Sequence, residues 1–214
     1  MHRSIRSTLL LLPLLFTCGR TSHASTVLIA NLTNGAEFPP TNPTTSTGQP
    51  RPASFGNATF ILNDDMSAMT MTVTIFNIDF TGSQTTDPND NLTIAHIHAS
   101  PTASLTSTAP VVWGFIGSPF NDTTPNDALV TPFTNGSVGG TVVGKWDAPE
   151  GQGTTLTAQL NNILTGHAYI NFHTTQFGGG ETRGFLTVVP EPSTLMLLGS
   201  AFLGLGLLRS RRRS

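Results

Sequence analysis

Residues 69–75 alternate strictly between apolar and polar side chains, and this alternation constrains the fold more than any other feature of the sequence. The apolar set is Met69, Met71, Val73 and Ile75, and the polar set is Thr70, Thr72 and Thr74. A period of two places each set on one face of an extended strand, so the pattern predicts a β-strand with one buried face. The apolar set then shifts to Phe76, Ile78 and Phe80, which indicates a bulge or a crossing between two sheets.

Other segments have the same extended character, and the residues between them favour turns. The predicted strands are Thr26–Leu32, Phe55–Leu62, Leu92–His98, Val111–Ile116, Val138–Trp146, Tyr169–His173 and Thr182–Val188. Apolar residues recur at helical spacing only in Thr155–Leu164, which predicts one short helix ending near Gly166. The prolines of residues 37–52 predict a long loop. The pattern therefore predicts an all-β fold, an antiparallel β-sandwich with one short helix.

The N-terminal residues have the three parts of a secretory signal. A basic start (1–6) precedes the apolar run 9–16, and Ser22–Ala24 is a small-x-small cleavage site. We predict a signal helix over residues 1–24, cleaved after Ala24. Cys18 offers a lipoprotein signal as a minor alternative, but the residues before it fit that signal poorly. Cys18 is the only cysteine, so the cleaved chain would hold no disulfide and would depend on packing alone.

The C-terminal residues also have three parts. Pro190, Glu191 and Pro192 precede the apolar run 195–208, and an arginine cluster follows at 209–213. The run predicts a hydrophobic helix, but it is shorter than the roughly 20 residues of a stable span, and the arginines favour the cytoplasmic side. This tail, residues 190–214, resembles the PEP-CTERM sorting signal of Gram-negative bacteria. The resemblance implies a transient membrane anchor that an exosortase recognises and removes, in organisms that make exopolysaccharide.

Residues 25–189 are long enough for one domain, and their charge excludes a class of partner. This segment holds 3 basic and 11 acidic residues, a formal charge of −8. Binding to nucleic acid needs clustered lysine and arginine, so we expect no nucleic-acid partner. An acidic surface is typical of a protein that must stay soluble outside the cell.

Four histidines lie in this segment, and three of them stand in strand patterns that would bring them together. His96 and His98 share one face of a strand because side chains alternate, and His173 stands in another predicted strand. A His-x-His pair with a third histidine suits a zinc or copper ion. Glu181, beyond a turn of three glycines, is the candidate fourth ligand.

The same residues also fit a structural polar network without a metal. Tyr169, Asn171 and Arg183 would join the histidines in such a network, with Glu181 and Arg183 as an ion pair on one face. His167 follows a predicted turn, so we expect it to be exposed to solvent. The sequence leaves the metal site and the polar network both open.

Several segments together resemble the CHRD domain, named after chordin. They are Leu28–Pro40, Phe55–Phe60, Ala95–His98, Leu164–Thr174 and Gly179–Gly184. The resemblance implies an extracellular module with an immunoglobulin-like or superoxide-dismutase-like sandwich. In chordin the domain is associated with secreted growth factors, and in bacteria its activity is unknown. Thr182 and the polar stretch Pro119–Pro132 depart from the family pattern.

Two functional hypotheses follow. The first is a non-enzymatic module of the cell envelope or extracellular matrix, which binds exopolysaccharide or an extracellular protein; the sequence has no nucleophile elbow, phosphate-binding loop or paired-carboxylate signature. The second is a zinc or copper protein built on His96, His98 and His173, with redox activity as one option.

Overall fold

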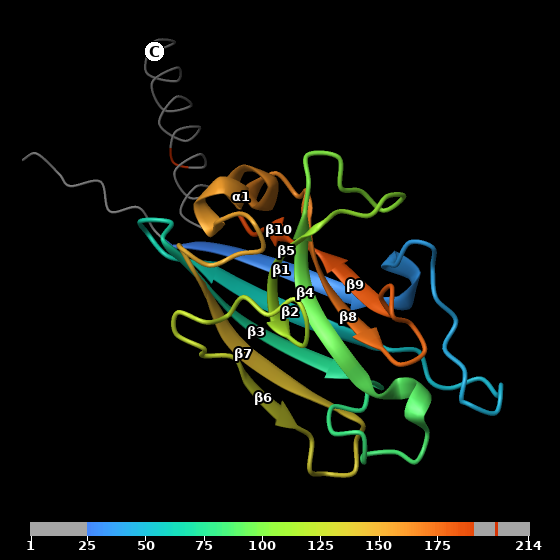
Figure 1. Cartoon of the computed structure of the whole chain (residues 1–214). Helices are drawn as coiled ribbons and strands as arrows, with labels where there is room; N and C mark the ends of the chain where they lie inside the picture. Colours follow the sequence, from blue (N-terminus) through green and yellow to red (C-terminus); the bar gives the residue numbers. More distant parts are fainter. Residues whose placement is uncertain (1–24, 191–199, 201–214) are drawn as a thin grey trace, which may run out of the picture.

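A computed structural model of the chain describes residues 25–190 and Ser200. The described residues form ten β-strands, one α-helix and two 3-10 turns (Figure 1). The strands are β1 (Thr26–Thr33), β2 (Phe55–Leu62), β3 (Ala68–Phe76), β4 (Leu92–Ala99), β5 (Val111–Ile116), β6 (Leu129–Pro132), β7 (Gly139–Asp147), β8 (Ala168–Thr174), β9 (Thr182–Phe185) and β10 (Thr187–Val188). The helix α1 spans Leu156–Leu164, and the turns are η1 (Asn34–Ala36) and η2 (Pro88–Asp90).

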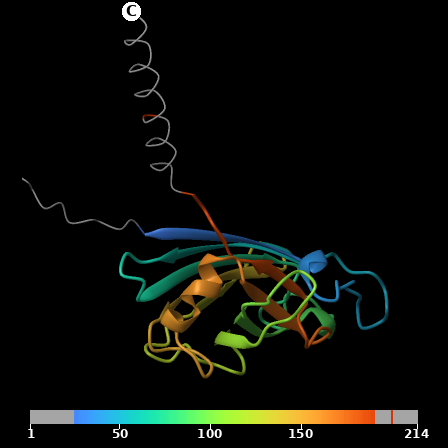
Figure 2. The ribbon, with the colours of Figure 1, turned by 90° about the horizontal axis from the view of Figure 1, so that it is seen from above.

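The strands form one continuous antiparallel sheet that curls over itself. Its order is β5-β4-β8-β9-β1-β2-β3-β7-β6, and β10 pairs with β1 off this path. Seen from above, the β5-β4-β8-β9 half lies beneath the β1-β2-β3-β7-β6 half (Figure 2). The two halves therefore act as the two layers of a sandwich, with the core between them.

The first strand, β1, lies between the second strand and the last two. It pairs with all eight residues of β2 on one edge. On its other edge, Leu28 and Ile29 pair with β10, and Thr33 pairs with Arg183 of β9. The Val189 N–H then donates to the Val27 carbonyl over 2.8 Å, so the two ends of the domain lie side by side.

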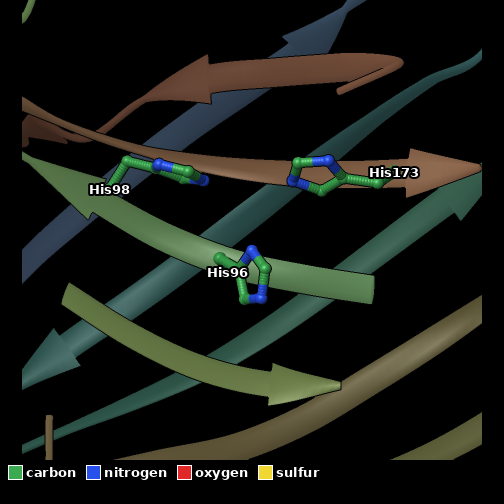
Figure 3. A group of neighbouring side chains, drawn as sticks. All are labelled: His96, His98 and His173. Atoms are coloured by element: carbon green, nitrogen blue, oxygen red, sulfur yellow. The ribbon is translucent and has the colours of Figure 1, made fainter. Parts of the chain in front are cut away.

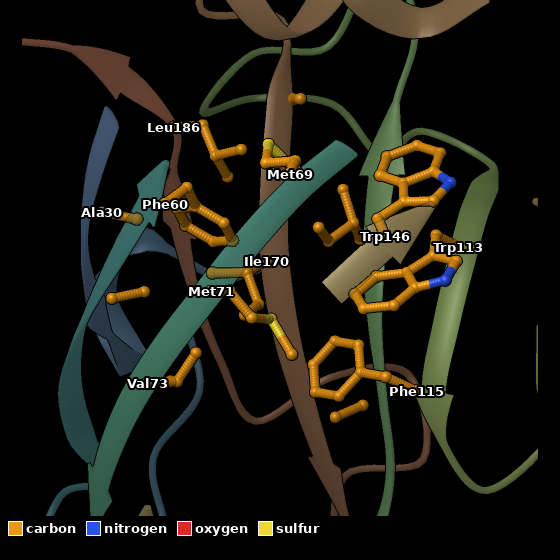
Figure 4. Close-up of a cluster of buried hydrophobic side chains, with 14 of the residues drawn as sticks. Ala30, Phe60, Met69, Met71, Val73, Trp113, Phe115, Trp146, Ile170 and Leu186 are labelled. Carbon is orange, nitrogen blue, oxygen red and sulfur yellow. The ribbon is translucent and has the colours of Figure 1, made fainter. Parts of the chain in front are cut away.

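Alternating side chains build the core. The apolar residues of the 69–75 run are all buried, whereas Thr70 and Thr72 are exposed, which confirms the predicted strand. Trp113 of β5 stacks on Trp146 of β7 with 5.7 Å between ring centroids (Figure 4). Because β5 and β7 stand far apart in the sheet order, this contact joins the two halves. Each fully buried large apolar side chain contributes roughly 1.5–3 kcal/mol to stability.

The short helix begins and ends where the sequence predicts. The Thr155 hydroxyl accepts a hydrogen bond from the Ala158 N–H over 3.2 Å and caps the first turn. Leu156 and Ile163 face the core. Gly166, with φ of 77°, adopts the left-handed conformation that glycine provides after a helix.

The predicted antiparallel sandwich with one short helix is confirmed, with two differences in detail. The two layers are halves of one sheet, and the stretch read as a polar insertion contains the edge strand β6, whose residues are mostly exposed and do not alternate. After β3 the chain turns at Asn77, with φ of 65°, and crosses to the other half. That crossing explains the shift of apolar residues after Ile75.

Some predicted features fall on parts of the chain that the structure does not describe. They are the signal helix, the hydrophobic C-terminal helix, Glu191 and Pro192 of the sorting motif. Pro190, the last residue described before them, is exposed. Within residues 25–190, no helix is both long and apolar enough to cross a membrane.

Candidate metal centre

The three histidines meet on the outer face of the β4–β8 pair. His96 and His98 alternate on β4 with the core residues Ala95 and Ile97, so both imidazoles point away from the core. In the antiparallel register, Ile94 of β4 stands opposite His173 of β8. The three rings converge on one point (Figure 3).

The geometry of these rings suits a single ion. One nitrogen of each of His96, His98 and His173 lies within 4.8 Å of the others. Zinc–nitrogen bonds of about 2.0–2.1 Å in a tetrahedral centre place ligand nitrogens roughly 3.4 Å apart, so small side-chain rotations bring all three onto one ion. The side chains are also shielded from water, because the residues are only 2%, 8% and 5% exposed.

Backbone carbonyls orient two of the rings. Nδ1 of His98 lies 2.9 Å from the Ala109 carbonyl oxygen, and Nδ1 of His173 lies 3.0 Å from that of Gly178. A carbonyl can only accept, so each Nδ1 carries the proton and each Nε2 presents a lone pair. This is the arrangement that fixes metal-binding histidines in other proteins.

Among residues 25–190, one nitrogen of each ring has no hydrogen-bond partner. These are Nε2 of His98, Nε2 of His173 and one nitrogen of His96, whose ring forms a hydrogen bond with the Ser118 backbone. An unpaired buried polar atom costs roughly 1–3 kcal/mol. Three such nitrogens in one place therefore indicate a site built for a ligand.

Burial keeps these imidazoles neutral. It lowers the pKa of His96 to about 4, and the neighbouring His173 adds to the shift. Burial likewise lowers the pKa of His98 to about 4, although the hydrogen bond to Ala109 acts to raise it. Burial also lowers the pKa of His173. Neutral imidazole is the form that binds metal, so the ligands are ready at neutral pH.

Arg183 of β9 holds the loops that cover this face. Its guanidinium is fully buried, and Nε donates to the carbonyl of Ala36. Nη1 and Nη2 donate to three carbonyls of the 104–107 loop, over 3.0–3.3 Å. The guanidinium also lies 4.7 Å from the ring centroid of Tyr169, whose ring stacks on His98 at 4.8 Å. Arg183 thus joins two loops to the strand beside the histidines.

The predicted ion pair between Glu181 and Arg183 is wrong. Glu181 instead binds Arg51, with Oε1 accepting from Nη1 over 2.9 Å and Oε2 from Nη2 over 2.5 Å. The Thr174 hydroxyl also donates to Oε2. Because these bonds occupy the carboxylate, the structure does not bring Glu181 to the histidine cluster. The acidic residue near Arg183 is Glu37, at 3.8 Å.

The other predicted residues are placed as follows. Asn171 and Tyr169 stand on β8 opposite His96 and His98, and Asn171 also stands opposite Arg183 of β9. His167 does not lie in the open as expected; it is half-buried, and its Nδ1 lies 3.1 Å from the Ala103 carbonyl oxygen.

Residues 28–186 match the family model of the CHRD domain. The chain belongs to the CHRD-domain family. The match covers strands β1 to β9 and includes all three clustered histidines. No curated protein and no solved structure matches the chain.

Residues 188–213 match the PEP-CTERM protein-sorting motif. The CHRD protein is therefore exported to the cell envelope of a Gram-negative bacterium and handled by an exosortase-type system.

The positions of the glycines and charged residues in Gly180–Gly184 of this CHRD domain follow from packing and ion pairing. Glu181 and Arg183 each hold a distant loop, as described above. A side chain at Gly180 would collide with Asn171, and one at Gly184 would lie 2.6 Å from the Asn31 carbonyl of β1. The two glycines therefore allow close packing on either side of the two charged residues.

Sequence reasoning missed two charged residues near the centre, Arg51 and Glu37. Both lie in the region of the long proline-rich loop, where no periodic pattern marks a buried position. One signal was present: the domain has only three basic residues, Arg51, Lys145 and Arg183. A domain with so few cations that buries both Glu37 and Glu181 must place some of its charges in specific ion pairs.

Proposed function

We propose that this CHRD domain binds one zinc or copper ion through His96, His98 and His173. The observation that carries the proposal is the set of three buried, neutral imidazoles, each with one nitrogen that has no partner among residues 25–190. Imidazole suits both ions, and no thiolate stands among the described residues to favour a softer one.

The test is the metal content of the full-length protein purified without chelators. We expect one equivalent of zinc or copper by elemental analysis, and its loss in His98→Ala and His173→Ala. His167→Ala is the matched control, because this histidine lies outside the cluster. Circular dichroism establishes that each variant is folded. Substoichiometric metal, together with a melting temperature that zinc and copper leave unchanged, would contradict the proposal.

A second candidate function, binding to a neutral polysaccharide of the matrix, is favoured by the outer face of the other half of the sheet. One row across five strands is entirely amide and hydroxyl: Asn31, Asn57, Thr74, Thr141 and Thr131 stand in register from β1 to β6. Neighbouring side chains in the row lie roughly 5 Å apart, the spacing of strands in a sheet.

Aromatic rings border this polar row. Phe55, which is 49% exposed, stacks on Phe76 with 4.9 Å between centroids, and Phe133 packs against Phe76. The acidic residues that give the domain its charge of −8 lie outside the row. A flat face of hydroxyls and amides beside exposed rings suits the hydroxyl groups and apolar ring faces of a neutral sugar chain.

Affinity electrophoresis in dextran gels tests this binding, with anionic alginate as the comparison polymer. We expect dextran to retard the full-length protein and Thr72→Glu to abolish the retardation, because it places a charge beside the row. Thr157→Glu on α1 is the control, since it adds the same charge at an exposed position away from the sheet. Equal mobility of all three proteins in dextran would reject this function.

A further inference from the structure

One more unpaired buried atom lies beside the histidines. Oδ1 of Asn171 has no hydrogen-bond partner among residues 25–190, and a hydrogen bond joins the side chains of Asn171 and Glu37. Asn171 stands directly opposite His96 in the sheet register and two residues before His173, so it shares their face. Side chains opposite each other in antiparallel strands have Cβ atoms roughly 4.5–5.5 Å apart. Asn171 is therefore within one side-chain length of the histidine cluster.

Glu37 lies behind Asn171. A Cβ atom at Gly180 would lie 2.5 Å from Nδ2 of Asn171 and 2.7 Å from Oε2 of Glu37, so both side chains converge at this glycine. The other carboxylate oxygen of Glu37 accepts the Phe38 N–H over 3.0 Å, which fixes the carboxylate in place. Arg183 stands 3.8 Å from the same oxygen.

A surface cavity of about 330 Å³ reaches Glu37. It is lined by residues 37–42 on one side and 176–180 on the other. Its lining includes Glu37, Gly180 and Gly178, whose carbonyl orients His173. The cavity therefore borders the carboxylate behind Asn171 and the residue whose carbonyl orients His173.

We propose that the ion bound by the three histidines keeps a fourth position for a water, which Asn171, with Glu37 behind it, positions and which a small anion can displace. The inference rests on the proposed metal function. Three protein ligands leave one place in a tetrahedral centre, as in zinc sites that exchange a bound water. The Asn171 carbonyl oxygen would accept a hydrogen bond from a water held there.

Cobalt(II) is the probe for this position, because its visible absorption reports its ligands. The full-length protein is loaded with one equivalent of cobalt and titrated with azide. We expect a saturable change in the visible bands, with cobalt still bound. A spectrum that azide leaves unchanged, in protein that binds cobalt stoichiometrically, overturns the inference and leaves metal binding standing. Failure to bind cobalt, zinc or copper at all overturns both.

Two variants test the positioning residues. Asn171→Ala removes the acceptor for the bound water but no partner of azide, which has no proton to donate. Azide should therefore displace the water more easily and bind about three- to tenfold more tightly, while cobalt stoichiometry is unchanged. Glu37→Gln preserves the shape of that side chain and should change azide affinity in a folded protein. Asn161→Ala, an exposed position on α1, is the matched control. Azide affinities equal to that of the unmodified protein in both test variants would reject the role of this pair.

Discussion

Replacing Arg183 with methionine should destabilise the domain by about 3–5 kcal/mol, the range for breaking a buried ionic network from one side. The guanidinium donates to Ala36 and to three carbonyls of the 104–107 loop, and it lies over Tyr169. Charged hydrogen bonds contribute roughly 1.5–3 kcal/mol each, but desolvation of the buried cation offsets part of their sum. Methionine fills the space and leaves the carbonyls without donors.

The assay is urea unfolding of the full-length protein, followed by circular dichroism with and without added zinc. A loss of this size corresponds to a fall of roughly 6–20 °C in the melting temperature of a domain this long. Lys145→Met is the control, because it also removes one positive charge, from a partly exposed pair with Asp127 and Asp147. The reasoning is refuted if Arg183→Met costs less than about 1 kcal/mol, the range for exposed ion pairs.

Three further predictions concern the metal, a buried acid and a glycine. Zinc at 100 times its dissociation constant should stabilise the folded protein by about 2.7 kcal/mol, and chelation should reverse the rise in melting temperature measured by calorimetry. Burial raises the pKa of Asp79, but hydrogen bonds from the N–H groups of residues 81–85 outweigh it and hold that pKa below its ordinary value. A depressed folded-state pKa stabilises above the unfolded pKa, so Asp79→Asn should be less stable than the unmodified protein at pH 6, and urea titrations should show the difference shrinking below about pH 4. Gly180→Ala should cost about 2 kcal/mol in the same urea assay, because φ is 125° and the new Cβ collides with two side chains, whereas Gly179→Ala has open space and should cost far less.

Most of the strands could be predicted because the pattern that indicates each one lies within that strand. The alternation of residues 69–75 and the spacing of Leu156 and Ile163 are visible without tertiary contacts. The edge strand β6 was not visible, since its residues face solvent and pair only with β7. The curling of both layers into one sheet depends on the bridge between β9 and β1, which involves the two ends of the domain.

The candidate site, like the fold, was predictable only where a single strand determines the arrangement of its residues. The shared face of His96 and His98 is a property of one strand, so the sequence was sufficient. The partner of Glu181 was not predictable, because Arg51 reaches it from a loop 130 residues away in the chain. Glu181 and Arg183 stand in one short motif, yet they bind different parts of the chain. The Glu181 carboxylate binds Arg51, whereas the Arg183 guanidinium binds the carbonyl of Ala36.

The position of β1 between β2 and the last strands means that the sheet is complete only when both ends of the domain are present. A secreted chain emerges from its N-terminus, so Thr26–Thr33 reaches the outside first, whereas Thr182–Val188 arrives last. One edge of β1 stays open until then, and pairing between such distant segments is slow to form. The matched sorting motif begins at residue 188, within β10 itself. The last seam of the sheet is therefore closed by the segment in which the sorting motif begins.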